Sequence, residues 1–223
     1  ETSAVVQLPN NSLQKFQLKP VGNGSYASVF SYFDENYNKL FALKRASKTI
    51  APKDLERFYL EFDTMKKLNS PYILEVYSID KKKNEYVMEY ADATLLKYIT
   101  THNQKLTFEE RKSLCNQIIK GFEYLAEKDI LHRDISPNNI LIKQYEDAKI
   151  IKIADLGNVK LSDSILTSLD TEIRGAFNDY SGLQRVGYSN YNFYFEGFAL
   201  SKLLYFVLTG RYKGFTKFEY SNL

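Results

Sequence analysis

Polar residues that could handle a proton and hold a metal ion gather in the middle of the chain. His132, Arg133 and Asp134 form a tight cluster between apolar residues. Asn139 follows five positions after that acid, and a second acid, Asp155, comes after further apolar runs. A carboxylate can orient a hydroxyl and accept its proton, and carboxylate and amide oxygens are ligands for Mg²⁺. These residue types therefore suit a site that positions a hydroxyl and binds Mg²⁺ on a phosphate chain.

Two short apolar runs predict the strands that hold these polar residues. Residues 140–142 and 150–153 are rich in isoleucine, and a polar turn at 144–149 separates them. Runs of this kind are typical of a β-hairpin. The hairpin would place Asn139 and Asp155 at strand ends that face one cleft.

A pair of glycines joins two predicted strands near the start of the chain. The strands are expected at residues 16–21 and 28–33, and the segment between them is Gly22, Asn23, Gly24, Ser25, Tyr26 and Ala27. Two glycines at this spacing let backbone amides approach a phosphate without a Cβ in the way. A hairpin turn uses the same glycines. A Rossmann site is not expected, because a strand and not a helix follows the glycines.

A lysine and a glutamate in the next two predicted elements form a candidate pair. The strand at residues 40–44 ends in Lys44. Apolar residues at three- and four-residue spacing predict a helix over 54–68, and Glu61 lies within it. For isolated residues, exposure at a strand end or on a helix surface is the alternative to an ion pair between the two.

The remaining pattern predicts an α+β protein with two lobes. Strands are expected at 72–79 and 85–90, and helices at 95–99, after Thr107, and at 198–208. We therefore expect a leader or linker at 1–12, a small antiparallel β lobe with one helix at 13–90, and a mainly helical lobe at 91–223. The polar segment 158–190 shows no clear period, and a loop of that length is usually functional.

Composition narrows the class of protein. Hydrophobic residues make up 44% and charged residues 26%, as in soluble globular domains, and the net charge of +3 is too small to predict nucleic-acid binding. The single cysteine, Cys115, lies in a helical apolar pattern and is expected to be buried packing. No apolar run of 18 residues occurs. The expectation is a soluble intracellular protein with neither nucleic acid nor membrane as its partner.

In order and spacing, these motifs resemble the eukaryotic-type protein kinases. The segment 132–139 resembles the catalytic loop H-R-D-x-x-x-x-N, and Asp155-Leu156-Gly157 resembles D-F-G. The glycine segment is similar to the glycine-rich loop, and residues 40–44 are similar to V-A-I-K. The resemblance covers residues 16 to about 210. It implies a two-lobed kinase fold whose large lobe is shortened, because the last several helices of an ordinary kinase are absent.

The resemblance also implies a chemistry. A kinase of this kind would use ATP and Mg²⁺ to phosphorylate a protein hydroxyl, on Ser or Thr rather than Tyr. Asp134 would orient the hydroxyl and accept its proton. Asn139 and Asp155 would hold Mg²⁺, while Lys44, fixed by Glu61, would place the phosphates.

Further residues would contact the nucleotide by the same resemblance. The loop from Gly22 to Ala27 would cover the phosphates, and Met88 would be the gatekeeper beside adenine. The carbonyl of Glu89 and the amide of Ala91 would bond adenine. Four apolar residues complete the expected nucleotide site, namely Val21, Val29, Ala42 and Leu141.

Several positions depart from the family pattern. Ser136 stands where Ser/Thr kinases usually carry a lysine, and a hydroxyl without charge predicts a lower rate. Ala27 replaces the third glycine of the loop, Glu196 stands where an aspartate is usual, and no A-P-E motif can be found. Because of Ser136, Leu156 and the missing A-P-E, an ATP-binding pseudokinase that acts as a scaffold is one alternative. A small-molecule kinase of the aminoglycoside or choline type is another, although such enzymes usually lack the arginine of H-R-D.

The segment 158–190 occupies the position of the kinase activation segment. Arg133 would be an uncompensated cation beside the catalytic acid, and kinases commonly pair it with a phosphate on this segment. Thr167, Ser168 and Thr171 are the candidate phosphorylation sites, and an acid such as Asp163 is the alternative partner for the arginine. A regulatory protein partner is a further expectation. The shortened lobe is similar to that of minimal bacterial effector kinases, so the location is expected to be the cytoplasm, or the host cytosol for a secreted effector.

Overall fold

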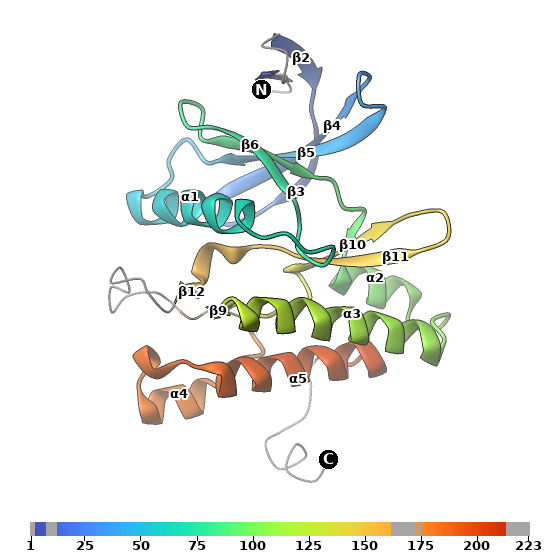
Figure 1. Cartoon of the computed structure of the whole chain (residues 1–223), viewed down its shortest axis with the longest axis vertical. Coiled ribbons are helices and arrows are strands. Elements are labelled where there is room, and N and C mark those ends of the chain that lie inside the picture. Colours follow the sequence, from blue (N-terminus) through green and yellow to red (C-terminus); the bar gives the residue numbers. More distant parts are fainter. Residues whose placement is uncertain (1–2, 8–12, 162–172, 174, 213–223) are drawn as a thin grey trace. The chain divides into compact units, whose positions relative to one another are not determined.

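The computed structural model describes residues 3–7, 13–161, 173 and 175–212 (Figure 1). The chain divides into two compact units, the first formed by Glu1–Asn69 with Leu74–Ala91 and the second by Ser70–Ile73 with Asp92–Leu223. Residues 70–73, expected in the small lobe, join the second unit because the carbonyl of Tyr72 accepts a hydrogen bond from the Ile153 amide at 2.7 Å.

A five-stranded antiparallel sheet forms the first unit, and its strand order is β3-β4-β5-β7-β6. This confirms the expected antiparallel sheet. The register shifts at a bulge between Pro20 and Gly22, where the glycine segment begins. The strands are β3 (Lys19–Asn23), β4 (Ala27–Asp34), β5 (Lys39–Ala46), β6 (Val76–Asp80) and β7 (Glu85–Glu89).

The helix of the first unit, α1 (Pro52–Lys66), begins two residues before the predicted start. Pro52 explains the difference, since proline lacks the amide hydrogen that a first-turn residue leaves unbonded, and its φ suits a helix. Phe58, Phe62 and Met65 are buried on one side of the helix, as their spacing predicts.

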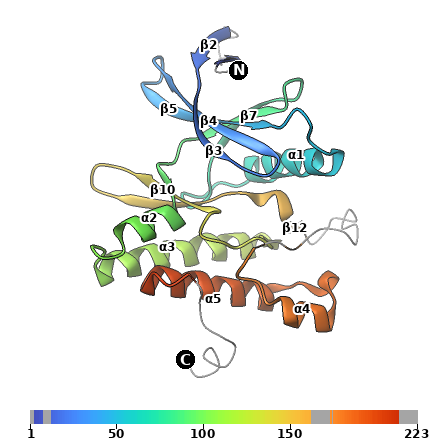
Figure 2. The same cartoon turned by 180° about the vertical axis from the view of Figure 1, so that it is seen from behind.

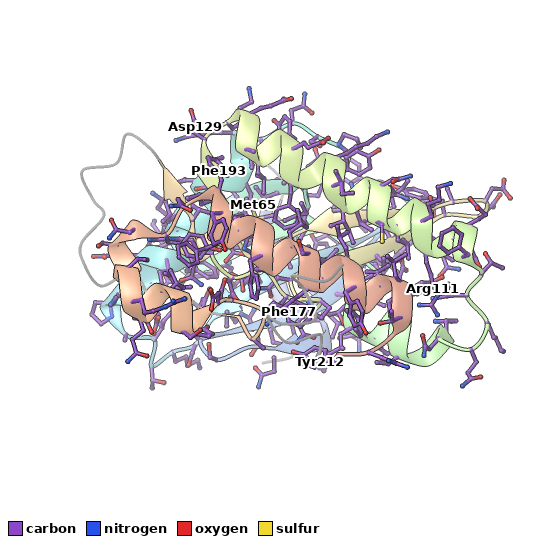
Figure 3. The ribbon with its side chains drawn as sticks, turned by 90° about the horizontal axis from the view of Figure 1, so that it is seen from below. Met65, Arg111, Asp129, Phe177, Phe193 and Tyr212 are labelled. Carbon is purple, nitrogen blue, oxygen red and sulfur yellow. The ribbon has the colours of Figure 1, made fainter. Side chains whose placement is uncertain are left out.

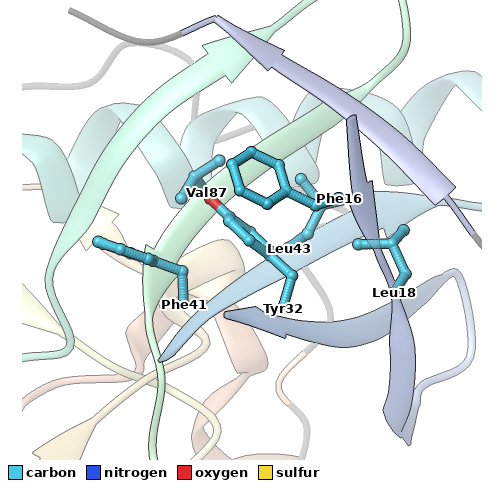
Figure 4. Close-up of a cluster of buried hydrophobic side chains, with 6 residues drawn as sticks. All are labelled: Phe16, Leu18, Tyr32, Phe41, Leu43 and Val87. Carbon is cyan, nitrogen blue, oxygen red and sulfur yellow. The ribbon is translucent and has the colours of Figure 1, made fainter. Parts of the chain in front are cut away.

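Apolar side chains on one face of the sheet form a cluster with Phe16 of β2 and with Leu18 (Figure 4). Successive residues of a strand point to opposite faces, so Leu43 and Val87 belong to this cluster while Lys44 and Tyr86 face the other way. The second face therefore carries the candidate lysine. The cluster consists of Phe16, Leu18, Tyr32, Phe41, Leu43 and Val87.

Residues expected to form a leader or linker include a strand. β1 (Ser3–Gln7) pairs antiparallel with β2 (Leu13–Gln17). The β-branched Val5 and Val6 favour extended backbone. The prediction of a leader or linker rested on the overall polarity of the segment and did not take these two residues into account.

Four helices are described in the second unit, together with short strands (Figure 2). The helices α3 and α5 lie side by side in both views. The helices are α2 (Leu95–His102), α3 (Phe108–Glu127), α4 (Tyr180–Val186) and α5 (Phe193–Thr209). The strands are β8 (Ala93–Thr94), β9 (Ile130–Leu131), β10 (Ile140–Gln144), β11 (Lys149–Ile153) and β12 (Lys160–Leu161).

Helix ends follow local sequence signals. Thr107 and Glu110 form a capping box at the start of α3, and Gly210 ends α5 in the left-handed region at φ 71°. Arg111 ties the two helices together, because its Nη1 donates to the Val207 carbonyl at 2.6 Å (Figure 3). No helix among the described residues has the length and apolar character needed to cross a bilayer.

Strand pairing in the second unit follows the expected hairpin. β10 and β11 pair antiparallel with Ile140 opposite Ile153, and β8 adds to the other side of β10. β9 pairs with β12 in a separate two-stranded sheet. A 3-10 turn, Leu156–Asn158, follows Asp155 directly.

Candidate active site

The first unit carries an ion pair between β5 and α1. Lys44 Nζ lies 2.5 Å from Glu61 Oε2, and the side chain of the glutamate is 3% exposed and that of the lysine 13%. A buried charge is costly unless it is paired, so each residue needs the other here. The sheet and the helix thus bring together two residues that are 17 positions apart.

The glycine segment leaves its backbone open. Residues 21–25 are exposed, and the Gly24 amide donates to the Ala27 carbonyl at 2.8 Å. A Cβ at position 24 would come within 3.3 Å of that carbonyl oxygen, so glycine suits the turn. The Ser28 hydroxyl donates to Asn23 Oδ1 at 2.7 Å and closes the turn further. Val29 lies opposite Gly22 on one side and Lys44 on the other.

The expected adenine-side residues lie at the end of β7. Met88 is buried and lies opposite Ala42 of β5. The Glu89 amide donates to the Glu75 carbonyl at 2.8 Å, and its side chain is buried. Ala91 is half-buried, while Val21 is 50% exposed.

In the second unit, His132 holds the loop that carries Asp134. The imidazole is fully buried, and its Nε2 lies 3.1 Å from the Ala154 carbonyl. The Asp134 amide donates to His132 Nδ1 at 3.3 Å, so Nδ1 accepts and Nε2 carries the hydrogen. Asn139 Nδ2 donates to the Asp134 carbonyl at 2.9 Å. The Asp134 side chain itself is half-buried.

A buried glutamate on α5 fixes the same loop from the other side. Glu196 Oε1 accepts from the His132 amide at 2.6 Å, and Oε2 accepts from the Arg133 amide at 3.3 Å. The Tyr191 hydroxyl donates to Oε2 at 2.6 Å. Burial, followed by the charge of Glu196, raises the pKa of Tyr191 well above its ordinary value, so the phenol stays protonated. Sequence reasoning missed Tyr191, because it follows a polar segment that has no period.

Arg133 combines a left-handed backbone with a buried, charged side chain. Its backbone is left-handed at φ 66°, its side chain is buried, and burial lowers the pKa of the guanidinium. Its Nε and Nη1 have no hydrogen-bond partner among the residues that the structure describes. The guanidinium carbon lies 5.8 Å from the centre of the Tyr191 ring. Thr167, Ser168, Thr171 and Asp163, its expected partners, lie outside the described residues.

The hairpin brings the two expected metal ligands to neighbouring positions. The Ala154 amide donates to the Asn139 carbonyl at 2.9 Å, so Asp155 directly follows a residue bonded to Asn139. Asp155 has a left-handed backbone at φ 61°, and within the described residues its buried Oδ1 has no hydrogen-bond partner. A buried carboxylate oxygen without a donor fits a cation ligand. Among the described residues, no three His, Cys, Asp or Glu side chains lie close enough together to hold a metal ion. A bound Mg²⁺ would therefore need further oxygens from phosphate or water.

Gly175 lies against the candidate catalytic acid, and sequence reasoning missed it. Its φ is 102°, and a Cβ there would lie 2.9 Å from Asp134 Oδ1. The Tyr180 hydroxyl donates to the Gly175 carbonyl at 2.9 Å. Burial, and to a lesser degree the charge of Asp134, raises the pKa of Tyr180. The only sequence signal was a glycine inside a polar segment.

Two other predicted residues, Ser136 and Leu141, lie in the same unit as Asp134. Ser136 is buried, and its carbonyl accepts from the Asn139 amide at 3.1 Å. Leu141 is half-buried on β10, opposite Thr94 and Lys152.

An antiparallel sheet with a Lys–Glu pair and a helical unit with an H-R-D loop together define a kinase-type fold. The model of the protein kinase domain matches residues 16–215, and this chain belongs to the protein kinase family. The match confirms the resemblance that the motifs indicated.

Curated relatives agree with this assignment. The chain is 33% identical to the carbon catabolite-derepressing protein kinase of Candida glabrata over 144 residues, which is 63% of this chain and 23% of that protein. It is 30% identical to the serine/threonine-protein kinase atg1 of Dictyostelium discoideum over 155 residues, 65% of this chain and 23% of that protein. It is 28% identical to the inhibitor of nuclear factor kappa-B kinase subunit beta of Bos taurus over 175 residues, 72% of this chain and 23% of that protein. The matched region is about a quarter of the length of these relatives.

Proposed function

We propose that this chain is an ATP- and Mg²⁺-dependent protein kinase domain that phosphorylates Ser or Thr hydroxyls of a protein substrate. The observation that carries the proposal is the buried Lys44–Glu61 pair, in which the cation needed for phosphate placement is already oriented at 2.5 Å from its carboxylate. The printed name of the Dictyostelium discoideum relative supports the choice of Ser and Thr.

Residues of the first unit would bind and orient the nucleotide. Lys44 places the phosphates, and Glu61 keeps the ammonium from turning away. The turn from Gly22 to Ala27 covers the phosphates. The Glu89 carbonyl and the Ala91 amide bond adenine, and the apolar contacts come from Val21, Val29, Ala42, Met88 and, in the second unit, Leu141.

Residues of the second unit would carry out the proton transfer. Asp134 orients the acceptor hydroxyl and takes its proton as the oxygen bonds to the γ-phosphorus of ATP, while the bond from that phosphorus to the bridging oxygen breaks and ADP leaves. Asn139 Oδ1 and Asp155 Oδ1, which has no hydrogen-bond partner within the described part of the chain, would hold Mg²⁺, which supplies positive charge against the phosphates. Ser136 adds no charge near the phosphate, and this predicts a modest rate.

Incubation of the purified protein with γ-labelled ATP, Mg²⁺ and a generic acceptor protein tests the proposal. We expect label on Ser or Thr after acid hydrolysis, and none with Asp134→Asn. Tight binding of ATP without any transfer would instead identify a nucleotide-binding scaffold. Label on a small molecule such as an aminoglycoside, with none on protein, would identify a small-molecule kinase.

Arg133 predicts an anion on the segment that follows the metal-binding acid. Among the described residues the buried Arg133 guanidinium has N–H groups without an acceptor, which is costly until an acceptor reaches them. We expect either a phosphate on Thr167, Ser168 or Thr171, or a carboxylate such as Asp163. In the first case, mass spectrometry of active protein finds phosphate in residues 158–190, and phosphatase lowers the rate. Full activity without phosphate there would favour the carboxylate, or a partner protein that orders the segment.

A further inference from the structure

The strand register places an aromatic residue directly beside Lys44. In the pairing of β5 with β7, Lys44 lies opposite Tyr86, and both side chains leave the same face of the sheet. Residues directly opposite in an antiparallel pair are the closest cross-strand neighbours. Tyr86 is 1% exposed, so its ring excludes water from the side of the lysine that it faces.

Two aromatic rings and one carboxylate surround the ammonium group. Lys44 Nζ lies 5.8 Å from the centre of the Tyr86 ring and 5.7 Å from that of Tyr26, in addition to its contact with Glu61. Both distances lie within the range of about 6 Å at which a ring attracts a cation. The attraction is stronger where water is excluded, as it is at the Tyr86 ring. The ring therefore favours the charged lysine at this place.

The same ring packs against the helix that carries Glu61. Phe58 and Phe62 are four residues apart on α1 and lie on one side of it. Their ring centres are 4.9 Å and 5.5 Å from that of Tyr86, with interplanar angles of 45° and 50°. Glu61 belongs to the turn between these two phenylalanines. Tyr86 thus contacts the ammonium group of Lys44 on one side and the turn of α1 that carries Glu61 on the other.

We propose that Tyr86 is a positioning residue for Lys44. Its ring face holds the ammonium, and its contacts with Phe58 and Phe62 hold the turn of α1 that presents Glu61. The ion pair is thereby set within the first unit alone, before nucleotide binds. The consequence for catalysis rests on the proposed kinase function, but the geometric claim does not.

Three variants separate the ring face from simple core packing. Tyr86→Phe keeps the ring, whereas Tyr86→Met fills the space and keeps contact with the phenylalanines but removes the ring face. Tyr32→Met is the matched control, because Tyr32 is a buried tyrosine of the same sheet that packs against Phe16 and Phe41 in the cluster on the opposite face. Thermal melts of all three report the general cost of losing a tyrosine.

The kinetic readout is the KM for ATP measured apart from kcat. We expect Tyr86→Met to raise the KM for ATP by about tenfold, in line with a desolvated cation–π contact, and Tyr86→Phe to stay within about twofold of wild type. Tyr32→Met should lower the melting temperature without changing that KM. An equal rise of KM in Tyr86→Met and Tyr32→Met would overturn the proposal, because loosening of the unit would explain both.

A second readout needs no turnover. The ε-methylene protons of Lys44, assigned by comparison with Lys44→Arg, should be shifted upfield by the ring current in wild type and Tyr86→Phe. They should move toward the random-coil position in Tyr86→Met and stay in place in Tyr32→Met. An unshifted signal in wild type overturns the proposal even if no variant folds. If wild type transfers no phosphate but shows the shift, and the shift falls in Tyr86→Met, the kinase proposal fails and the role of Tyr86 in placing Lys44 stands.

Discussion

The side chains of the candidate site are held in place by hydrogen bonds and ion pairs with neighbouring residues. Lys44 is oriented by Glu61, and Asp134 lies on a loop that His132 and Glu196 bond from two sides. The proposed reactive groups are therefore fixed by neighbouring side chains. Replacing a reactive group and replacing its support should have different kinetic signatures.

Lys44→Met should lower kcat/KM by at least about a hundredfold, because a preorganised charge aimed at phosphate is lost. It should also lower the melting temperature, because the buried Glu61 carboxylate loses this ammonium. Glu61→Gln should have a smaller effect, of about tenfold, since the lysine keeps its charge and loses only one orienting partner. Steady-state kinetics at varied ATP measures both. Circular dichroism serves as the folding control, and undiminished turnover of a folded Lys44→Met protein would remove the lysine from the mechanism.

Asp134→Asn should abolish turnover while sparing affinity for Mg-ATP, because proton acceptance is needed only in the transition state. Asp155→Asn should weaken Mg-ATP binding as well as the rate, since it removes a charged metal ligand. Titration calorimetry with a non-hydrolysable ATP analogue separates the two. Equal loss of affinity in both variants would point to a structural role for Asp134.

Secondary structure was predictable where the apolar period was long or the end signals were strong. The repeat within α1 and the capping box at Thr107 located two helices to within a few residues. Helix α5 begins at Phe193, five residues before its predicted start, since Asn192 caps it and accepts from the Tyr194 amide. Helix α4 escaped prediction, because seven residues are too few to show a period and its cap, Asp179, is a common loop residue.

The sequence motifs identified the candidate site residues, but they did not identify the residues that pack against or bond to them. Tyr86, Tyr191 and Gly175 carry no sequence signal of their own, because their roles depend on register and on contacts between distant segments. Gly175 is the sharpest case, since its role is to leave space for the Asp134 carboxylate.

Gly175→Ala should lower kcat by about tenfold or more with little change in affinity for ATP. Its Cβ would crowd Asp134 Oδ1 at 2.9 Å, and φ 102° is costly for alanine. Gly197→Ala is the matched control, because it lies inside α5 with nothing within 4 Å of a built Cβ. The control should keep its rate and gain about 0.5–1 kcal/mol in the free energy of unfolding. Equal kcat values for Gly175→Ala and wild type would contradict the crowding argument.

The chain taken as a whole has two units, and each has a buried core of its own. The kinase-domain match runs through both of them, from residue 16 to residue 215. The sequence contains one cysteine, and burial raises the pKa of the Cys115 thiol to about 11. Its thiol is therefore a natural reporter of global unfolding, because it becomes reactive at neutral pH only when the second unit opens.

Mg-ATP at a hundred times its dissociation constant should stabilise the protein by about 2.7 kcal/mol, which raises the melting temperature by about 5–10 °C. Excess EDTA should remove most of this gain and stop turnover. It should leave the melting temperature of the nucleotide-free protein unchanged, since Asn139 and Asp155 form no closed metal cage among the described residues. Differential scanning fluorimetry measures all three states, and a drop in stability with EDTA alone would reveal a structural metal.

Arg133 and Asp155, two residues of the candidate site, have left-handed backbone conformations that glycine adopts at no cost. Each such conformation costs about 1–2 kcal/mol in an L-residue. A laboratory selection for heat resistance alone would therefore favour glycine or asparagine at both positions. The selected proteins would be more stable but would have lost the proposed metal ligand and the buried cation, so such a selection must also require phosphate transfer at every round.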